Sequence, residues 1–277
     1  MLRSLGHEVE TLHPPKRMSH GILSLIRWWA KQTKALESAH HDLLFLHQPM
    51  LNFRPSVKVP VISYFHVSYT GKAAAFAKYF PFSWERQYYR FVARLEKDCM
   101  SNLRGYKILT SSQSVASDLG SDEPLPFYVG FEGVKAHGQG LLWIGRNAKV
   151  KNREYAEEIQ RYIHPLITFA TSVPHGKMSY LMSCHKYILS TSVYEGLPVS
   201  LLEGISCGLI PLVSDIPPLS EVVSNVKGGC TFNLNDPSRA AAQIVDYMSR
   251  PRTVDFNTIY GREAISLKLK KCIENAD

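Results

Sequence analysis

The segment from residue 190 to residue 215, STSVYEGLPVSLLEGISCGLIPLVSD, constrains the fold more than any other stretch. It begins as the end of an apolar strand, continues through a tight loop and ends in a second apolar strand. Between them Pro198 suits a first helical position, because the amide that proline lacks has no helical partner there. A helix can run from Val199 to Cys207, and Gly208 can end it. This alternation of strand and helix predicts an α/β fold.

The start of this helix also predicts a binding site for an anion. Backbone amides there have no helical partner, and the helix dipole favours negative charge; the expected donors are Gly196, Leu197, Val199 and Ser200. Glu195 and Glu203 would repel a phosphate, so each is expected to accept hydrogen bonds from hydroxyl groups on either side of it. The alternative is an ordinary helix packed under a sheet, with two solvated glutamates.

Two glutamates separated by seven residues, in a frame like "S..EG.P...LE..A.G.P", resemble the donor-binding signature of the family 4 retaining glycosyltransferases (glycosyl transferases group 1). Glu195 and Glu203 have this spacing, with Ser192, Gly196, Pro198, Leu202 and Gly208 in register. Thr191, Ser206 and Ile210 depart from the usual proline, alanine and proline. The resemblance implies the GT-B fold, with two Rossmann-like lobes and a cleft between them.

Three further segments resemble the same family. LLWIGRNAKVK resembles "l.fvGRl...KG", with Gly145, Arg146 and Lys151 in register, and the resemblance implies that Arg146 and Lys151 neutralise the donor diphosphate. The strand expected over residues 59–71 ends at His66, which the resemblance places beside the anomeric carbon of the donor sugar. GHEV at residues 6–9 resembles the start of the family's second strand, so a strand is expected at Glu8–Leu12.

The resemblance divides the chain into an acceptor-side lobe, residues 1–133, and a nucleotide-sugar-binding lobe, residues 134–277. The family's first strand and its glycine-rich loop would precede residue 1, so the chain is expected to be N-terminally shortened, with a trimmed sheet in each lobe. Further strands are expected at 41–49 and 107–112, and residues 141–163 are expected to form a strand, a loop and a helix. Helices are expected at 114–120, 238–249 and 257–275, the second capped by Asp236 or Ser238 and the last returning to the first lobe.

The resemblance implies a transferase that moves a sugar from a nucleotide-diphosphate sugar to an unknown acceptor with retention of configuration. Its catalytic residues would be His66, Arg146, Lys151 and Glu195. The sequence contains no Asp-x-Asp motif for Mg²⁺ or Mn²⁺ and no zinc spacing, so neither metal nor cofactor is expected. His40, His41 and His47 are interpreted as structural. The alternative function is nucleotide-sugar binding without catalysis, or half of a split transferase.

Charge separates the two halves of the chain. The net charge is +8, and residues 14–110 contain fifteen Lys or Arg against five Asp or Glu. The basic aromatic stretches 20–39 and 72–98 fit peripheral contact with a membrane surface or with an anionic or lipid-linked glycan acceptor. Core helices with snorkelling side chains explain the same pattern. Nucleic acid is the less favoured partner, because the expected anion site suits a small phosphorylated ligand.

Cysteine use and hydropathy indicate a cytoplasmic protein, and the family resemblance implies a role in glycan biosynthesis. The five cysteines are scattered without a CxxC pair, as expected of reduced thiols. The sequence contains neither a run of eighteen apolar residues nor an apolar signal-peptide core at its start. Localisation at the inner face of a membrane is the alternative.

Overall fold

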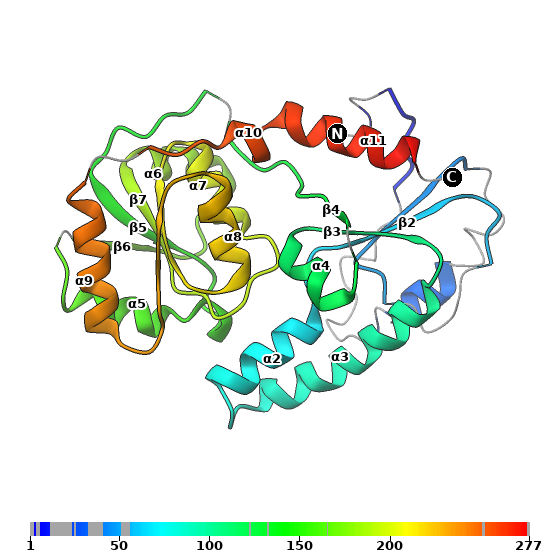
Figure 1. Cartoon of the computed structure of the whole chain (residues 1–277), viewed down its shortest axis with the longest axis horizontal. Coiled ribbons are helices and arrows are strands. Elements are labelled where there is room, and N and C mark those ends of the chain that lie inside the picture. The colour runs from blue at the N-terminus through cyan, green and yellow to red at the C-terminus, as the bar shows by residue number, and fades with distance from the viewer. Residues whose placement is uncertain are drawn as a thin grey trace. The chain divides into compact units, whose positions relative to one another are not determined.

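The computed structural model describes residues 3, 6–11, 24, 26–32, 41–50, 56–121, 123–131, 133–164, 166–250 and 253–275. The chain forms two compact units, labelled by element in Figure 1. Unit 1 comprises Met1–Pro126 and Ser266–Asp277, and unit 2 comprises Phe127–Ile265. The division falls at Pro126, whereas the sequence places the domain boundary after residue 133. The assignment of Ser266–Asp277 to unit 1 agrees with the return expected of the last helix.

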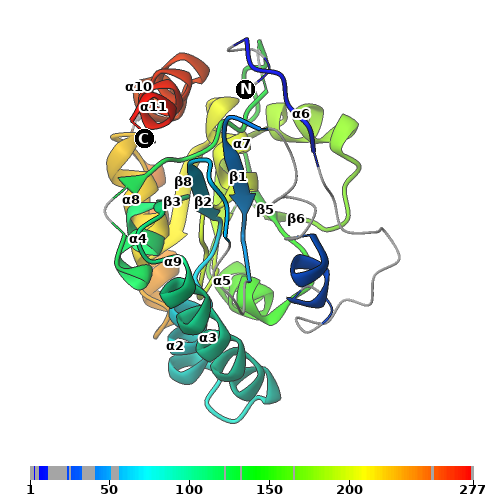
Figure 2. The ribbon, with the colours of Figure 1, turned by 90° about the vertical axis from the view of Figure 1, so that its right-hand side faces the viewer.

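Unit 1 is built on a parallel sheet whose order is β1-β2-β3-β4. The strands are β1 (Leu44–His47), β2 (Val61–Phe65), β3 (Lys107–Thr110) and β4 (Glu123–Pro124). The helices are α2 (Tyr69–Tyr79), α3 (Trp84–Asn102), α4 (Gln113–Leu119) and most of α11 (Arg262–Glu274). The strands β1, β2 and β3 lie side by side in Figure 2.

The core of unit 1 lies where α3 and α4 pack on this sheet. All five residues of β2 are buried, as expected of a central parallel strand covered on both faces. Residues 26–32 are helical, and Trp29 belongs to the core while Arg27 and Lys31 are exposed. This supports core packing for the described part of the expected helix 20–39, whose other residues lie outside the described ranges.

The prediction of a strand at Glu8–Leu12 is wrong for residues 8–11, which the structure describes. Residues 7–11 have no regular secondary structure, and Leu12 lies outside the described residues. A strand requires a neighbour for its backbone amides and carbonyls. None of the described strands pairs with these residues.

Unit 2 has a second parallel sheet, with the order β6-β5-β7-β8-β9. The strands are β5 (Gly140–Ile144), β6 (Ile167–Ala170), β7 (His185–Ser190), β8 (Ile210–Ser214) and β9 (Cys230–Phe232). The helical segments are η2 (Lys149–Lys151), α5 (Arg153–Gln160), α6 (His175–Ser183), α7 (Val199–Ser206), α8 (Pro217–Asn225), α9 (Pro237–Met248) and α10 (Asn257–Tyr260). Strand and helix alternate along the chain, as the sequence predicts for an α/β fold.

Alternation within the strands of unit 2 creates two core layers. Leu141 and Trp143 point to the face covered by α5 and α9, whereas Leu142 points to the face covered by α6, α7 and α8. Successive side chains of a strand point to opposite faces, so continuous apolar runs are buried on both sides. The α7 helix is thereby fixed beside β7, with its first residue at the carboxyl edge of the sheet.

Helix ends follow their local sequence signals closely. Asp236 caps α9, since its Oδ1 accepts from the amides of Ser238 at 2.9 Å and Arg239 at 3.1 Å. Gly208 follows α7 with a φ of 92°, a conformation that glycine adopts without steric cost. Among the described residues, no helix is long and apolar enough to span a membrane.

Candidate functional site

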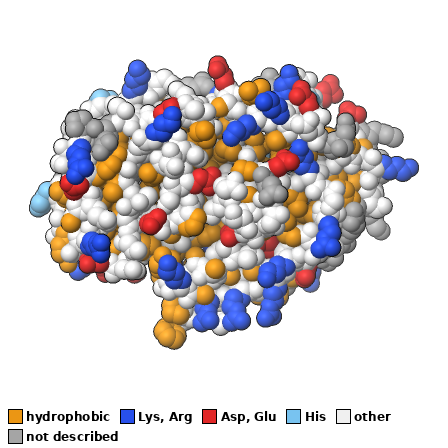
Figure 3. All heavy atoms as spheres, viewed as in Figure 1, with side chains coloured by type: hydrophobic (Ala, Val, Ile, Leu, Met, Phe, Trp, Pro, Cys, Tyr) orange, Lys and Arg blue, Asp and Glu red, His pale blue; other side chains and the backbone are white. Residues whose placement is uncertain are grey.

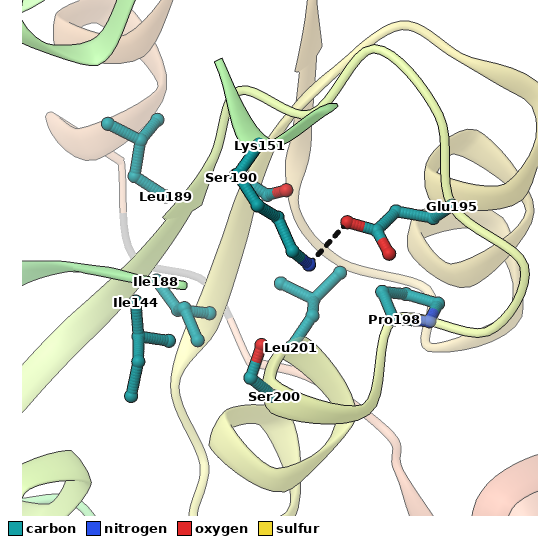
Figure 4. A pocket seen from close by; sticks show the side chains of 9 residues that line it. All are labelled: Ile144, Lys151, Ile188, Leu189, Ser190, Glu195, Pro198, Ser200 and Leu201. Carbon is teal, nitrogen blue, oxygen red and sulfur yellow. Dashed lines mark hydrogen bonds and ion pairs between the residues drawn. The ribbon is translucent and has the colours of Figure 1, made fainter. Parts of the chain in front are cut away.

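A small pocket lies in unit 2 where β5, β7 and the start of α7 meet (Figure 4). The space between its walls is about 230 Å³, part of it open to solvent. Its lining residues are Ile144, Lys151, Ile188, Leu189, Ser190, Glu195, Pro198, Ser200 and Leu201. Ligands of open α/β folds bind outside the carboxyl ends of the strands, where this pocket lies.

An ion pair between Lys151 and Glu195 crosses the pocket. Nζ of Lys151 lies 2.6 Å from Oε1 of Glu195, and the two side chains are only 19% and 12% exposed. The hydroxyl of Ser192 donates to the same Oε1 at 2.6 Å. Among the described residues, Oε2 of Glu195 makes no hydrogen bond, and Lys151 uses one of its three N–H groups. The pair can therefore hold its geometry and still bind a ligand that offers both acceptors and hydroxyls.

The buried hydroxyl of Thr191 fastens the η2 turn to the loop that carries Glu195. Trp143 Nε1 donates to Thr191 Oγ1 at 3.0 Å. The same oxygen lies 2.9 Å from the carbonyl of Asn152 and 3.0 Å from that of Lys151, so its proton can go to either. The sequence interpretation noted Thr191 only as a departure from proline. The signal that could have found it is a polar residue beside the motif at a position expected to be buried.

Gly145 and Arg146 follow β5 and occupy different surroundings. A Cβ atom on Gly145 would lie 3.2 Å from the Trp143 ring and 3.4 Å from Cγ of Lys151, so a side chain there would crowd Lys151. The Arg146 side chain is exposed, does not line the pocket and has no hydrogen-bond or ion-pair partner among the described residues. Of the two cations expected at a diphosphate, the structure therefore brings only Lys151 to the pocket.

The α7 helix begins at the pocket without a side-chain cap. Pro198 is the N-cap residue of α7, whereas the sequence predicts it as the first helical residue. The first intrahelical bond runs from the Leu202 amide to the Pro198 carbonyl at 3.0 Å. The amides before Leu202 therefore have no helical acceptor. Ser200 lines the pocket and Val199 is 38% exposed, whereas Gly196 and Leu197 are buried. The positive end of the helix dipole thus lies beside the Lys151–Glu195 pair.

Glu203 lies one turn into α7, close to a histidine that the sequence interpretation missed. Its side chain is 13% exposed, and Oε1 lies 4.0 Å from Nδ1 of His175. Burial raises the pKa of Glu203, and the nearby His175 partly offsets this. The His175 ring, at the start of α6, also lies 5.4 Å from the Phe131 ring. Only the fold brings these three elements together, since no sequence motif joins them.

His66 belongs to unit 1, where it pairs with a second histidine. Its Nε2 lies 3.1 Å from Nδ1 of His47, so one ring donates to the other. Gln48 Oε1 accepts from the His66 amide at 2.8 Å, and the Ser111 hydroxyl donates to the His66 carbonyl at 2.8 Å. Burial, together with the nearby His47, lowers the pKa of His66 to about 4, and burial lowers the pKa of His47. His66 is therefore neutral at pH 7.

Among the described residues, no three His, Cys, Asp or Glu side chains gather in a way that could hold a metal ion. The polar groups that meet in unit 2 are instead one lysine, two glutamates and the backbone amides of α7. Such groups suit a ligand that combines negative charge with hydroxyls.

Comparison with known proteins agrees with this arrangement. Residues 131–250 match the family model described as glycosyl transferases group 1. Over 119 residues the chain is 28% identical to the GDP-mannose:cellobiosyl-diphosphopolyprenol alpha-mannosyltransferase of Xanthomonas oryzae pv. oryzae. This match covers 43% of the chain and 31% of the relative, so the matching segment spans about a third of the relative's length.

Solved structures extend the likeness over most of the chain. The sucrose-phosphate synthase of Thermosynechococcus elongatus superposes with a TM-score of 0.73 at 12% identity, covering 95% of this chain and 80% of that one. Anabaena HepE in complex with UDP and glucose gives a TM-score of 0.60 at 10% identity, covering 92% and 83%. At these identities the likeness establishes the fold. The chain has the GT-B fold, and its residues 131–250, which carry the pocket, are similar to glycosyl transferases group 1.

Proposed function

We propose that this protein is a retaining glycosyltransferase that moves a sugar from a nucleotide-diphosphate sugar to an acceptor without a metal ion. One observation carries the proposal: the Lys151–Glu195 pair lies at the uncapped start of α7, with Glu203 one turn further along the helix. Groups that attract negative charge and groups that accept hydrogen bonds therefore lie close together. The phosphates and hydroxyls of a nucleotide-diphosphate sugar are likewise close together, so the two sets are complementary.

Each group has a distinct role in the proposed reaction. When the bond to the sugar breaks, the departing nucleoside diphosphate gains negative charge, which the ammonium of Lys151 and the amides of α7 stabilise. Oε2 of Glu195 and the carboxylate of Glu203 accept hydrogen bonds from hydroxyls of the sugar and the ribose. The exposed guanidinium of Arg146 donates further hydrogen bonds from its coplanar N–H groups when a diphosphate binds.

His66 of unit 1 is a further proposed catalytic residue, which only the family resemblance supports. Because its pKa lies near 4, the ring is neutral at pH 7 and can either donate or accept a hydrogen bond beside the anomeric carbon. We assign it this role from the family resemblance, and we assign His47 the role of fixing its orientation.

Retention and metal independence are tested on the reaction itself. The anomeric proton of the product, followed by NMR from the first turnover, should report the same configuration as the donor. The rate should be unchanged in EDTA, because Lys151 and the α7 dipole supply the positive charge. Loss of turnover in EDTA that added Mg²⁺ or Mn²⁺ restores would overturn metal independence.

The donor and the acceptor are to be identified by panels. The named relative uses GDP-mannose and a diphosphopolyprenol-linked acceptor, and a structural neighbour holds UDP and glucose. GDP-mannose and UDP-glucose are therefore the first donors to test by thermal shift, since a ligand that binds only the native state raises the melting temperature. A lipid-linked diphosphate glycan is the first acceptor to test, and with such an acceptor we propose that the reaction takes place at the cytoplasmic face of a membrane.

Substitutions of the proposed diphosphate-binding and sugar-binding residues give the sharpest test. Lys151→Ala, Glu195→Ala and Arg146→Ala should each lower kcat/KM for transfer by about 100-fold or more. Arg153→Ala is the matched control, because Arg153 begins α5 next to this loop and pairs with Glu157 at 2.7 Å. Full activity in any of the three variants would overturn the role given to that residue. Donor binding by calorimetry without any turnover would instead support nucleotide-sugar binding without catalysis.

A further inference from the structure

The hairpin formed by α2 and α3 carries an exposed aromatic face that the proposed chemistry does not use. Phe82 in the turn is 101% exposed, Trp84 is 71% exposed, and Tyr88 and Phe91 are 36% and 46% exposed. Of the ten large hydrophobic side chains exposed among the described residues, these four lie in one stretch of ten residues. Trp84, Tyr88 and Phe91 have the spacing i, i+4, i+7, so they share one side of α3.

Packing of the hairpin does not require this aromatic face. An adjacent side of α3 already buries Val92, Ala93 and Cys99. Phe76 of α2 packs against Tyr89, with ring centroids 4.8 Å apart. The α3 helix is therefore apolar on two sides, one facing α2 and the core of unit 1 and the other facing solvent.

The start of α2 is fixed to α3 by the buried carboxylate of Glu96. This group accepts from the amides of Tyr69 and Thr70, each at 2.8 Å, and from the hydroxyl of Ser68 at 3.3 Å. It occupies the positive end of α2, so that helix start is satisfied within the protein. The hairpin is thus tied at its base, while Phe82 and Trp84 project at the opposite end.

Basic side chains flank the aromatic face. Arg90, Arg94 and Lys97 are exposed and have no ion-pair partner among the described residues. They repeat at the same i, i+4, i+7 spacing and lie roughly 120° around the helix from the aromatic stripe. Figure 3 shows hydrophobic side chains protruding at the turn of this hairpin, with a row of Lys and Arg side chains beside them. The only acidic side chain of α3 that is exposed is Asp98.

We propose that this face, Phe82, Trp84, Tyr88 and Phe91 with Arg90, Arg94 and Lys97, docks onto the surface of a bilayer that contains anionic phospholipid. Aromatic rings enter the boundary between headgroups and acyl chains, and the basic residues meet the lipid phosphates. Projecting aromatic side chains favour a bilayer over single-stranded nucleic acid, whose bases stack within a basic groove. The inference goes beyond the proposed transfer reaction and does not depend on it.

Vesicle sedimentation without any nucleotide sugar tests the proposal. The full chain should bind vesicles of phosphatidylcholine with phosphatidylglycerol at least about tenfold more tightly than vesicles of phosphatidylcholine alone. Raising the ionic strength from about 0.1 M to about 1 M shortens the Debye length from about 10 Å to about 3 Å, so binding should weaken. Equal binding to both vesicles, or none to either, would overturn the proposal.

Two variants separate the aromatic from the electrostatic contribution. Phe82→Ser with Trp84→Ser should abolish sedimentation with the anionic vesicles, and Arg90→Gln with Arg94→Gln and Lys97→Gln should weaken it by about tenfold or more. The matched controls are the exposed aromatics Tyr162→Ser with Tyr180→Ser, and the exposed bases Arg161→Gln with Arg239→Gln and Lys268→Gln. An equal loss in the controls would show that binding is not localised to the hairpin.

Trp84→Phe provides a variant that keeps the ring and the fold. It should still sediment, but quenching of tryptophan emission by brominated acyl chains should fall, because Trp84 enters the bilayer. Unchanged quenching would contradict insertion at this site. The hairpin variants could instead keep vesicle binding and lose the binding of an oligonucleotide or the formation of a dimer. That result would assign the face to the nucleic acid or to a second copy of the chain. Sugar transfer with a soluble acceptor is measured separately, so either proposal can fail alone.

Discussion

At the scale of single residues, the pocket depends on polar groups that satisfy one another while leaving capacity for a ligand. Oε1 of Glu195 accepts hydrogen bonds from Lys151 and Ser192, and Oε2 can accept further hydrogen bonds from a ligand. Thr191 accepts from Trp143 and donates to a carbonyl of the η2 turn. A buried polar atom without a partner is costly, so these bonds hold the loop in one arrangement.

Thr191→Val tests the fastening of this loop. The substitution keeps the shape but leaves the Trp143 N–H without its acceptor, so the free energy of unfolding should fall by about 1–3 kcal/mol. Transfer activity should fall as well, because Lys151 loses its support. Urea denaturation and kcat/KM measure the two effects. Thr191→Ser, which keeps the hydroxyl, should stay close to the wild type, and equal losses in both variants would contradict the role of the hydroxyl.

His66 predicts a dependence of stability on pH. The pKa of histidine is about 6.5 in an unfolded chain and about 4 for His66 in the folded protein. The unfolded state therefore binds the proton first as the pH falls. The stability that His66 contributes is complete above about pH 6.5 and is lost as the pH falls toward about 4. His47, whose pKa is also lowered, adds to the loss.

Chemical denaturation at about pH 7.5 and about pH 5 measures this loss. His66→Gln should reduce it by about 1 kcal/mol, a value discounted for the solvent around a half-buried ring. The exposed His164→Gln is the control and should leave the loss unchanged. The same loss of stability in His66→Gln and wild type would contradict the assignment.

At the scale of elements, the pocket exists because α7 is held tightly against β7. Leu201, Leu202 and Ile205 anchor the helix in the core, and Gly204 allows its close approach. A Cβ atom on Gly204 would lie 2.7 Å from Cδ1 of Ile188, closer than such atoms pack. The helix start, with its unpaired amides, is thereby positioned by apolar contacts on the far side of the same helix.

Gly204→Ala should destabilise the protein by about 1–3 kcal/mol through overpacking, although alanine is the better helix former. Adding Ile188→Val removes the clashing Cδ1, so the double variant should lose less than the sum of the single variants. Gly176→Ala in α6 is the control, since a Cβ there meets nothing within 4 Å. Thermal unfolding measures all four, and an unchanged melting temperature in Gly204→Ala would contradict the close approach.

At the scale of the whole molecule, the two units contain separate cores and separate candidate residues. Every residue that lines the pocket lies in Phe127–Ile265, whereas His66 and the α2–α3 hairpin lie in Met1–Pro126. The groups proposed to bind the donor thus lie in one unit, and the proposed membrane-docking surface lies in the other. The net charge of +8 is consistent with this division, because the basic excess lies in residues 14–110.

Hydrogen exchange with a saturating donor tests this division. Donor at about 100 times its Kd should stabilise the native state by about 2.7 kcal/mol. Added protection should concentrate at the η2 turn and over residues 191–206, while the α2–α3 hairpin should be unchanged. Anionic vesicles should give the opposite pattern. If the donor instead protected the amides of the hairpin from exchange and left those of the η2 turn unchanged, the proposed location of the donor site would be wrong.

Sequence alone determined the parts of this protein that depend on neighbours in the chain. Continuous apolar runs and their spacing predicted parallel strands alternating with helices, and Asp236 and Gly208 predicted helix ends correctly. The spacing of Glu195 and Glu203 predicted the family that the comparison of residues 131–250 supports. These features act within a few residues, where backbone sterics and hydrogen bonds decide the outcome.

Tertiary structure decided the contacts between distant segments. Lys151 meets Glu195, Trp143 meets Thr191 and His47 meets His66 across 44, 48 and 19 positions of the sequence. Whether a buried polar atom finds a partner depends on which strands become neighbours, which no local pattern specifies. The same reason explains the strand wrongly expected from residue 8, because a strand forms only where another chain segment completes its hydrogen bonds.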